Sequence, residues 1–470
     1  MADYREVTEW VEERENRFIA IADEIWANPE LALAEFKACK LQSESLAEDG
    51  FTITSNIGGL PTAFMAEYSQ GEGGPVIGFL GEYDALPGLS QNKVAVQNPI
   101  IPDSPGHGCG HNLLGTAALA AAVTIKEWLK HTGKAGTVRY YGCPAEETIE
   151  GKVYMARAGA FDDLDAALTW HPGSVNSVWA GSSLAVNNLK FKFKGRTAHA
   201  AANPETGRSA LDAVELMNVG VNFMREHVPD AARIHYVITQ GGGAPNVVPD
   251  EAEVWYFVRA PERTMVEELT ERVRNIAKGA TLMTETTVTE IFNAGAYNML
   301  SNQVIGDRMQ EVLEDLGPIP FEEAEIAWAK EVSSAFPDSL RSGILNAESL
   351  PLDLMNAGLP SQVYPIRDRG KTMPGSTDVA DVSWVTPTAQ FTTTCFALAV
   401  PGHSWAITST AGMTIGHKGM VHAAKVLAIV ATDLWEKPEL LAAAKAEFTE
   451  STGGKPYVCP IPADVEPRKP

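Results

Sequence analysis

The sequence predicts an α/β fold: a main domain built on a mixed, mostly parallel sheet, with a smaller α+β domain inserted into it. At 470 residues the chain exceeds the ~250–300 residues at which single cores usually divide, so two domains are expected. Buried-type strands first alternate with helices, which is typical of a parallel sheet with both faces covered. The order then changes to strand, helix, strand, strand and helix, before the chain returns to the main domain. The predicted domains are residues 1–186 with 296–470, and residues 187–295.

The elements of the first part follow from residue spacing. Residues 4–28 carry apolar side chains at helical intervals and predict one long amphipathic helix. The alternating elements after it are strands at 76–80, 137–141 and 166–170 and helices at 113–129 and 152–158. Working side chains in such sheets gather just beyond the carboxyl ends of strands. The residues that fall at these positions are Asp84, Glu146, Glu147 and His171.

The inserted segment has a different pattern. Residues 189–194 alternate apolar and basic side chains, as in a half-exposed strand. The elements expected after it are helices at 209–225 and 265–283 and strands at 234–239 and 252–260. Residues 318–372 show little periodicity, which is typical of a functional loop or of a missed element. The proline-rich residues 454–470 predict an extended strap or tail.

Composition excludes several classes of partner. The formal net charge of −23 argues against nucleic acid and anionic membrane surfaces, since both need a basic protein surface. The longest uncharged apolar run is far short of the ~20 residues that span a bilayer, and the charged N-terminus has no apolar signal segment. Five scattered cysteines do not make a disulfide framework. We therefore expect a cytoplasmic protein that acts on a small molecule.

The most specific motif is the run Pro105–His111, which places a thiol and an imidazole two positions apart among three glycines. Cys109 and His111 would stand on a turn directly before a helix, where sites in α/β proteins lie. A buried cysteine and a helix-capping histidine are the alternative. The glycines disfavour it, because a core segment rarely needs such flexibility. His107 is better explained as a hydrogen-bonding neighbour than as a metal ligand.

Further ligand types follow other predicted strands. The adjacent carboxylates Glu146 and Glu147 point in different directions, so one can bind a metal while the other holds a water; a solvated acidic loop is the alternative. His171 ends a buried strand, and His403 repeats that pattern near the other end of the chain. Such ligands suit zinc, or less tightly manganese or cobalt, as one or two divalent ions. The five candidates exceed one tetrahedral site and suit two ions that share a ligand: Cys109, His111, Glu147, His171 and His403.

Other chemistries lack support in the sequence. It contains no His-Glu-x-x-His helix, no Gly-x-Ser-x-Gly elbow, no phosphate loop and no Gly-x-Gly-x-x-Gly turn. Two residues of the inserted segment carry no functional signal of their own. On its own pattern, His199 is consistent with a surface histidine, and Asn246 with a turn residue between strands.

The order of these motifs resembles that of the metal-dependent amidohydrolases of the aminoacylase and carboxypeptidase group. The resemblance runs nearly end to end, and its motifs are Gly81–Pro87, Gly108–His111, Pro144–Glu147, Trp170–His171, Ala198–Ala201 and Gly402–Ser404. One departure concerns Thr148–Gly151, where relatives usually have a glycine-rich turn. Because this stretch lies close to the expected site, the exact substrate cannot be copied from a relative.

The resemblance implies a role for each candidate residue of the main, catalytic domain. Glu146 would be the general base, and Asp84 would lie near the metal centre behind the ligands. The implied metal ligands are Cys109, His111, Glu147, His171 and His403.

The resemblance also implies that the inserted domain is a lid and dimerisation domain. His199 would cross a dimer interface into the partner's active site and stabilise the oxyanion, and Asn246 would contact substrate. The implied assembly is a homodimer or a larger oligomer, or one half of a two-subunit enzyme that is inactive or weakly active alone.

The implied activity is hydrolysis of an amide C–N bond by a metal-activated water with a glutamate as base. The expected substrate is an N-acyl amino acid, an aryl amide such as p-aminobenzoyl-glutamate, or a dipeptide-like molecule. A metal-stabilised binding protein without turnover is the alternative from a different class.

Overall fold

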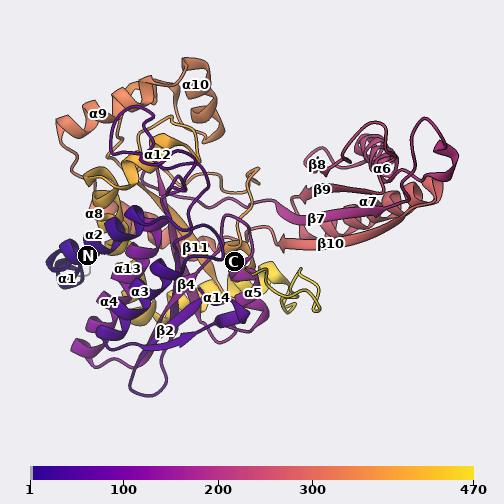
Figure 1. The fold of residues 1–470 in the computed structure, drawn as a ribbon. Helices are drawn as coiled ribbons and strands as arrows, with labels where there is room; N and C mark the ends of the chain where they lie inside the picture. The colour runs from indigo at the N-terminus through magenta and orange to yellow at the C-terminus, as the bar shows by residue number, and fades with distance from the viewer. Residues whose placement is uncertain (1–3, 470) are drawn as a thin grey trace.

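The computed structural model describes residues 4–469, which form two sheets and the helices around them (Figure 1). The larger sheet has the strand order β1-β2-β4-β3-β5-β11-β6. Its strands are β1 (Thr52–Ser55), β2 (Phe64–Gln70), β3 (Val76–Glu82), β4 (Gly136–Cys143), β5 (Ala166–Gly173), β6 (Ser177–Val178) and β11 (Thr388–Thr394). The central strands β4, β3, β5 and β11 are parallel, and the others pair antiparallel. The predicted mixed, mostly parallel sheet is therefore confirmed.

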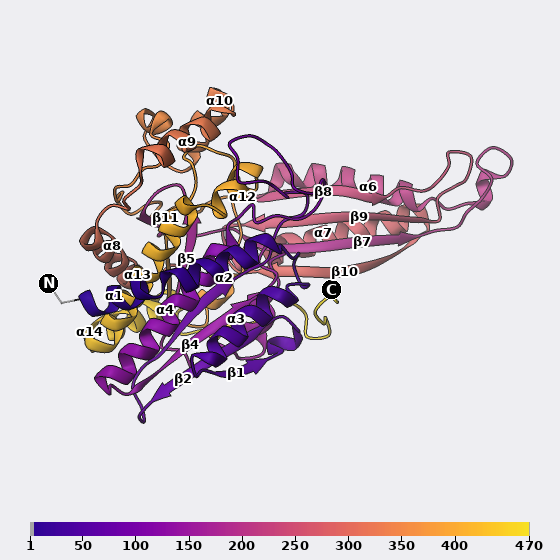
Figure 2. The same ribbon diagram turned by 60° about the vertical axis from the view of Figure 1, so that its left-hand side comes forward.

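Helices cover this sheet and build its core (Figure 2). They are α1 (Arg5–Glu13), α2 (Glu15–Ala27), α3 (Phe36–Glu48), α4 (His111–Thr132), α5 (Gly151–Arg157), α8 (Gln303–Leu316), α11 (Val379–Ser383), α12 (Trp405–Ala411), α13 (Thr414–Glu436) and α14 (Pro438–Thr452). The alanine-rich helix α4 packs against α13 and β3. A Cβ at Gly115 would collide with the carbonyl oxygen of Glu82, so glycine there lets the first turn of α4 lie directly on the end of β3.

The second sheet has the order β10-β7-β9-β8, and two helices pack on it. Its elements are β7 (Ala185–Lys194), α6 (Ala210–Met224), β8 (Arg233–Gln240), β9 (Glu251–Ala260), α7 (Arg263–Thr284) and β10 (Thr287–Ala296). We call this unit the lid; it projects away from the larger sheet in Figure 1. Strand β10 was missed from the sequence. Its exposed side chains do not alternate cleanly with buried ones, and its pairing with β7 is interrupted near Asn293.

One other expectation is corrected. The single helix expected over residues 4–28 is two helices, which meet at the non-helical Arg14. Of the two alternatives for residues 318–372, the missed element holds, since the segment contains α9 (Glu323–Ser334) and α10 (Asp338–Ala347). Short 3₁₀ turns occur at Ile57–Gly59, Pro204–Thr206, Arg225–His227 and Leu352–Asn356.

Residues 455–469 of the predicted strap contain no helix or strand; residue 470 lies outside the described residues. Across residues 4–469, none of the helices combines the length and the apolar character that crossing a membrane requires.

Candidate metal centre

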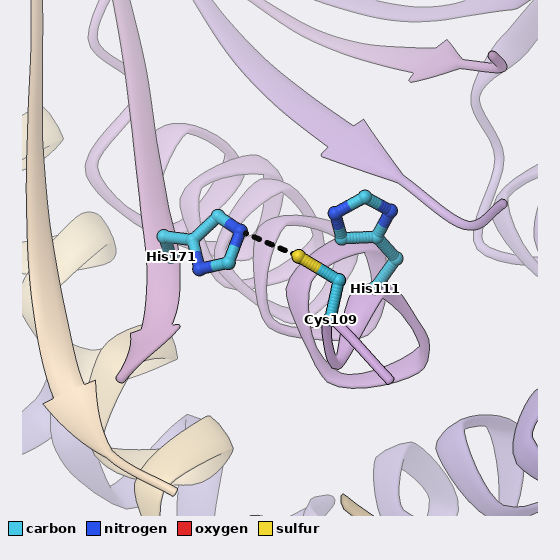
Figure 3. Close-up of side chains that lie close together, drawn as sticks. All are labelled: Cys109, His111 and His171. Carbon is cyan, nitrogen blue, oxygen red and sulfur yellow. Dashed lines mark hydrogen bonds between the residues drawn. The ribbon is translucent and has the colours of Figure 1, made fainter. Parts of the chain in front are cut away.

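Potential metal ligands converge at the carboxyl ends of the central strands. Cys109 stands just before α4, His111 is the first residue of α4, and His171 lies in β5. The Cys109 Sγ lies 3.4 Å from the His171 Nε2, and the centroids of the two imidazole rings are 5.7 Å apart. Figure 3 shows the thiol directed toward the space between the rings. These three residues offer ligand atoms that all lie within 4.8 Å of one another.

Glu147 and His403 extend this group on its open side. The His403 Nε2 lies 3.5 Å from a carboxylate oxygen of Glu147, and with the Cys109 thiol these atoms form a second group within 4.8 Å. His403 does not end a strand, contrary to the prediction. It lies in a loop that begins after β11 and ends before α12, with a left-handed backbone (φ 51°) and a side chain that is 57% exposed. The proline and glycine that precede it favour this turn.

Asp84 connects two of the candidate ligands. Its Oδ1 lies 2.8 Å from the His111 Nδ1, and its Oδ2 accepts a hydrogen bond of 2.8 Å from the Glu147 backbone N–H. Burial opposes the charged form of Asp84, but the neighbouring His111 outweighs this effect and lowers the pKa of the carboxyl below its usual value. Asp84 therefore orients the His111 ring. It also holds the turn that contains Glu146 and Glu147, residues 145–150, which we call the glutamate turn.

Glu82 is a member of the cluster that sequence reasoning missed. It is the last residue of β3, and its Oε2 lies 3.2 Å from the His111 Nε2. Together with Glu146 these residues form a third group within 4.8 Å. Strand alternation offered a signal, because Glu82 precedes Asp84 by two residues and so belongs to the same face.

A buried lysine compensates part of this negative charge. The Lys152 Nζ lies 2.6 Å from a carboxylate oxygen of Glu82 and 2.6 Å from one of Asp378, and all three side chains are buried. Lys152 and Asp378 were also missed. They are far apart in the sequence, and nothing in the helix that begins at Gly151 indicates that its lysine points inward.

Burial, followed by the negative charges of Glu82 and Asp378, raises the pKa of Glu146 well above its ordinary range.

His107 lies outside the three ligand groups. It is buried, and its Nε2 lies 3.2 Å from the carbonyl oxygen of Ile25. Burial lowers the pKa of His107 to about 3, so its imidazole is neutral.

The lid residues His199 and Asn246 are not brought to this centre. They lie in two adjacent loops at the end of the lid, where the Ala200 N–H donates a 3.0 Å hydrogen bond to the Asn246 carbonyl. Both residues are exposed, and neither lines the cleft described below. The His199 Nδ1 accepts hydrogen bonds from the backbone N–H groups of Ala201 and Ala202.

A cleft of about 550 Å³ leads from the ligand cluster to two arginines that sequence reasoning also missed. Arg259 lies near the end of β9, and Arg367 lies in the segment without periodicity. The Arg367 Nη2 donates a 3.2 Å hydrogen bond to the Thr392 hydroxyl, and its Nη1 lies 3.6 Å from Glu348. Among residues 4–469, the buried Nε of each arginine has no hydrogen-bond partner. Two arginines thus line the same cleft as the acidic cluster.

Thiol, imidazole and carboxylate groups gathered at the open end of a parallel sheet, beside a cleft, define a metal-dependent hydrolase of the α/β class. Residues 186–282 match the family model of the M20 peptidase dimerisation domain. The chain is 43% identical to one of the subunits of the p-aminobenzoyl-glutamate hydrolase of Escherichia coli (strain K12), over 99% of this chain and 98% of that protein. It is 30% identical to the Xaa-Arg dipeptidase of Mus musculus, over 94% and 91% of the two chains. The protein belongs to the M20 family of amide- and peptide-bond hydrolases.

Solved structures show the same fold. An aminobenzoyl-glutamate utilization protein from Klebsiella pneumoniae matches with a TM-score of 0.63 and 18% identity, over 91% of this chain and 98% of that one. A dinuclear metal-binding peptidase of the M20 family from Bacillus subtilis matches with a TM-score of 0.60 and 18% identity, over 90% and 99% of the two chains.

Proposed function

We propose that this protein hydrolyses the amide bond of a small N-acyl or N-aroyl amino acid at a centre of one or two divalent cations. The observation that carries the proposal is the convergence of three overlapping ligand groups at the head of a cleft that also contains two guanidinium groups. The similarity to a subunit of p-aminobenzoyl-glutamate hydrolase supports an aroyl amino acid as substrate.

The side chains fit a divalent cation. Among the described residues, three buried atoms of the cluster lack any hydrogen-bond partner: the Nε2 of His111, an Oε of Glu82 and an Oε of Glu147. A cation held by His111 and Glu147 would satisfy the orphaned atoms of these two residues and offset the negative charge around them. Thiolate, imidazole and carboxylate donors suit zinc, and also manganese or cobalt. The residues that would hold the cation or cations are Cys109, His111, Glu147, His171 and His403.

Glu146 would serve as the base. A divalent cation supplies Lewis-acid polarisation of the substrate carbonyl and lowers the pKa of water. A carboxylate oxygen of Glu146 would take a proton from the attacking water and deliver it to the leaving amine nitrogen. Such acid–base catalysis contributes typically about 10²–10⁴-fold.

Arg259 and Arg367 would bind a carboxylate of the substrate. Both arginines line the cleft, so their positive charge lies beside any substrate bound there. Charge-assisted pairs between arginine and carboxylate are strong and directional. The substrate class would therefore be amides that carry a free carboxylate on the amine portion.

The lid would complete the site in a homodimer. Strand β8 is an edge of the lid sheet, and Val219 and Phe223 lie exposed at helical spacing on α6. Pairing through this face would let His199 of one protomer reach the oxyanion in its partner, with Asn246 beside it. A second, homologous subunit is the alternative, since two of the relatives are named as different subunits of one hydrolase.

A panel of amides tests the proposal, assayed on the purified chain with zinc, manganese or cobalt. We expect turnover of p-aminobenzoyl-glutamate or N-acyl amino acids, and a loss of at least about tenfold in kcat/KM when the carboxylates are replaced by carboxamides. Bound metal without turnover on any amide would instead indicate a binding protein. Turnover that requires a homologous subunit would indicate a two-subunit enzyme.

A further inference from the structure

The C-terminal residues 454–469, which we call the strap, pack against the helix that follows the glutamate turn. Arg157 of α5 donates hydrogen bonds to the carbonyls of Pro462 and Val465, at 3.4 and 2.7 Å. The Tyr154 hydroxyl donates to the carbonyl of Glu466 at 3.2 Å. In Figure 1 the yellow C-terminal segment lies beside α5. Residues 462–466 of the strap are thus held against α5 before the chain reaches the turn.

The strap ends in an ion pair with that turn. The Arg468 Nε donates to one carboxylate oxygen of Glu150 at 2.8 Å, and its Nη2 donates to the other at 2.6 Å. The Glu150 side chain is 1% exposed, whereas that of Arg468 is 52% exposed. Burying a carboxylate is unfavourable unless it is paired, so the guanidinium group stabilises Glu150 in its buried position. The Thr148 hydroxyl donates a further hydrogen bond to Glu150, at 2.7 Å.

The turn between Ala145 and Glu150 needs such support. Ala145 and Ile149 both have left-handed backbones, with φ of 56° and 61°, although neither is glycine. This conformation is strained, most of all for a β-branched residue, and persists only where the surroundings enforce it. Asp84 anchors the turn at the Glu147 N–H, and Arg468 anchors it at Glu150. Glu146 directly precedes the first of these two anchored residues.

We propose that Arg468 is a positioning residue: by holding Glu150, it keeps the turn in the conformation that directs Glu146 toward the ligand cluster. The conformation at the ligand cluster then depends on a residue of the strap. The kinetic part of this inference rests on the proposed role of Glu146 as base. The structural part, that Arg468 holds the turn, does not.

The kinetic test compares Arg468→Ala with Lys469→Ala, which removes an exposed neighbouring cation. We expect Arg468→Ala to lower kcat about tenfold or more with KM within about twofold, because a displaced base impairs proton transfer more than binding. Arg468→Lys should recover only part of the loss, since lysine cannot bind both oxygens in the guanidinium geometry. Millimolar guanidinium chloride should partly rescue Arg468→Ala, because the guanidinium position is half exposed, and should not activate the wild type.

The structural test measures hydrogen exchange in chelator-treated protein. The Ile149 N–H donates to the Glu146 carbonyl and the Glu150 N–H to the Ala145 carbonyl. Both amides should exchange faster in Arg468→Ala and at the wild-type rate in Lys469→Ala. If exchange is unchanged, or if exchange rises while kcat of an active enzyme does not fall, the positioning role is wrong. If the wild type hydrolyses no amide, the proposed function fails, and exchange alone decides whether Arg468 holds the turn.

Discussion

The ligand cluster is buried at its centre and held by contacts between distant segments, whereas the lid residues are exposed and their histidine ring is held by local contacts. His111 is completely buried, contacts Asp84 and Glu82, and lies at the meeting point of β3 and α4. His199 is exposed in a loop at the end of the lid, and its ring accepts hydrogen bonds from the backbone of residues two and three positions along the chain. The groups of the cluster therefore meet within one chain, whereas a catalytic role for the lid residues requires closure or a second chain.

The largest expected effect is on kcat, and it distinguishes the proposed base from the proposed metal ligands. Glu146→Gln should lower kcat by about 10³-fold or more while the metal content stays at the wild-type level, because the amide cannot accept the proton. Steady-state kinetics and metal analysis of the same preparation measure both quantities. Glu72→Gln, at an exposed glutamate, is the control. Retention of more than about a tenth of the activity would remove Glu146 from the role of base.

The next prediction tests whether the lid acts across a dimer. His199→Ala should lose about 10²–10³-fold in kcat, as is typical when one oxyanion donor is removed. Mixing it with Glu146→Gln under subunit exchange should restore about a quarter of the wild-type activity, since half of the dimers are mixed and each has one intact site. If the mixture stays inactive although the subunits exchange, His199 serves its own chain or none.

Metal affinity tests which residues of the glycine-rich run belong to the centre. Cys109→Ala should weaken the binding of zinc by at least about 10–100-fold, because a ligand contributes no less than the groups that orient ligands. His107→Ala is the matched control from the same run and should bind metal like the wild type. Titration against a chromophoric chelator measures both affinities. Equal affinities would exclude Cys109 as a ligand.

The smallest expected effect is on the pH dependence of stability, and it arises from a buried histidine that is not a candidate metal ligand. His422 on α13 is buried, its Nε2 has no partner among the described residues, and burial together with Lys425 lowers its pKa to about 4. Because the unfolded chain then binds more protons than the native protein, stability is present above pH ~6.5 and is lost as the pH falls toward 4. Between pH 7 and 5 the free energy of unfolding should fall by about 2 kcal/mol more in the wild type than in His422→Leu. Urea unfolding of chelator-treated protein at both pH values measures this difference. Equal slopes would show that His422 is not the titrating group.

The sequence was informative where a function depends on local pattern. The apolar strands β3, β4 and β5 were visible as runs, and parallel strands bring their carboxyl ends to one edge of the sheet. Asp84, Glu147 and His171 were found for this reason. His403 was placed at the wrong kind of element, because a turn histidine and a strand-end histidine look alike in sequence.

The residues that escaped prediction depend on contacts between distant segments. Lys152 pairs with Asp378, 226 positions away, and Arg468 pairs with Glu150, 318 positions away. Thr148–Gly151 acquires a long-range anchor through the second of these pairs.

The sequence by itself determined the family, the α/β class and the residue types that can bind a metal. These properties follow from periodicity and motif order, which are local. Tertiary structure alone decided that Lys152 pairs with Asp378 beside the cluster, that the cleft contains Arg259 and Arg367, and that the lid histidine lies apart from it. The physical reason is that burial and ion pairing depend on which segments the sheet and its crossovers bring together, and no local pattern encodes that proximity.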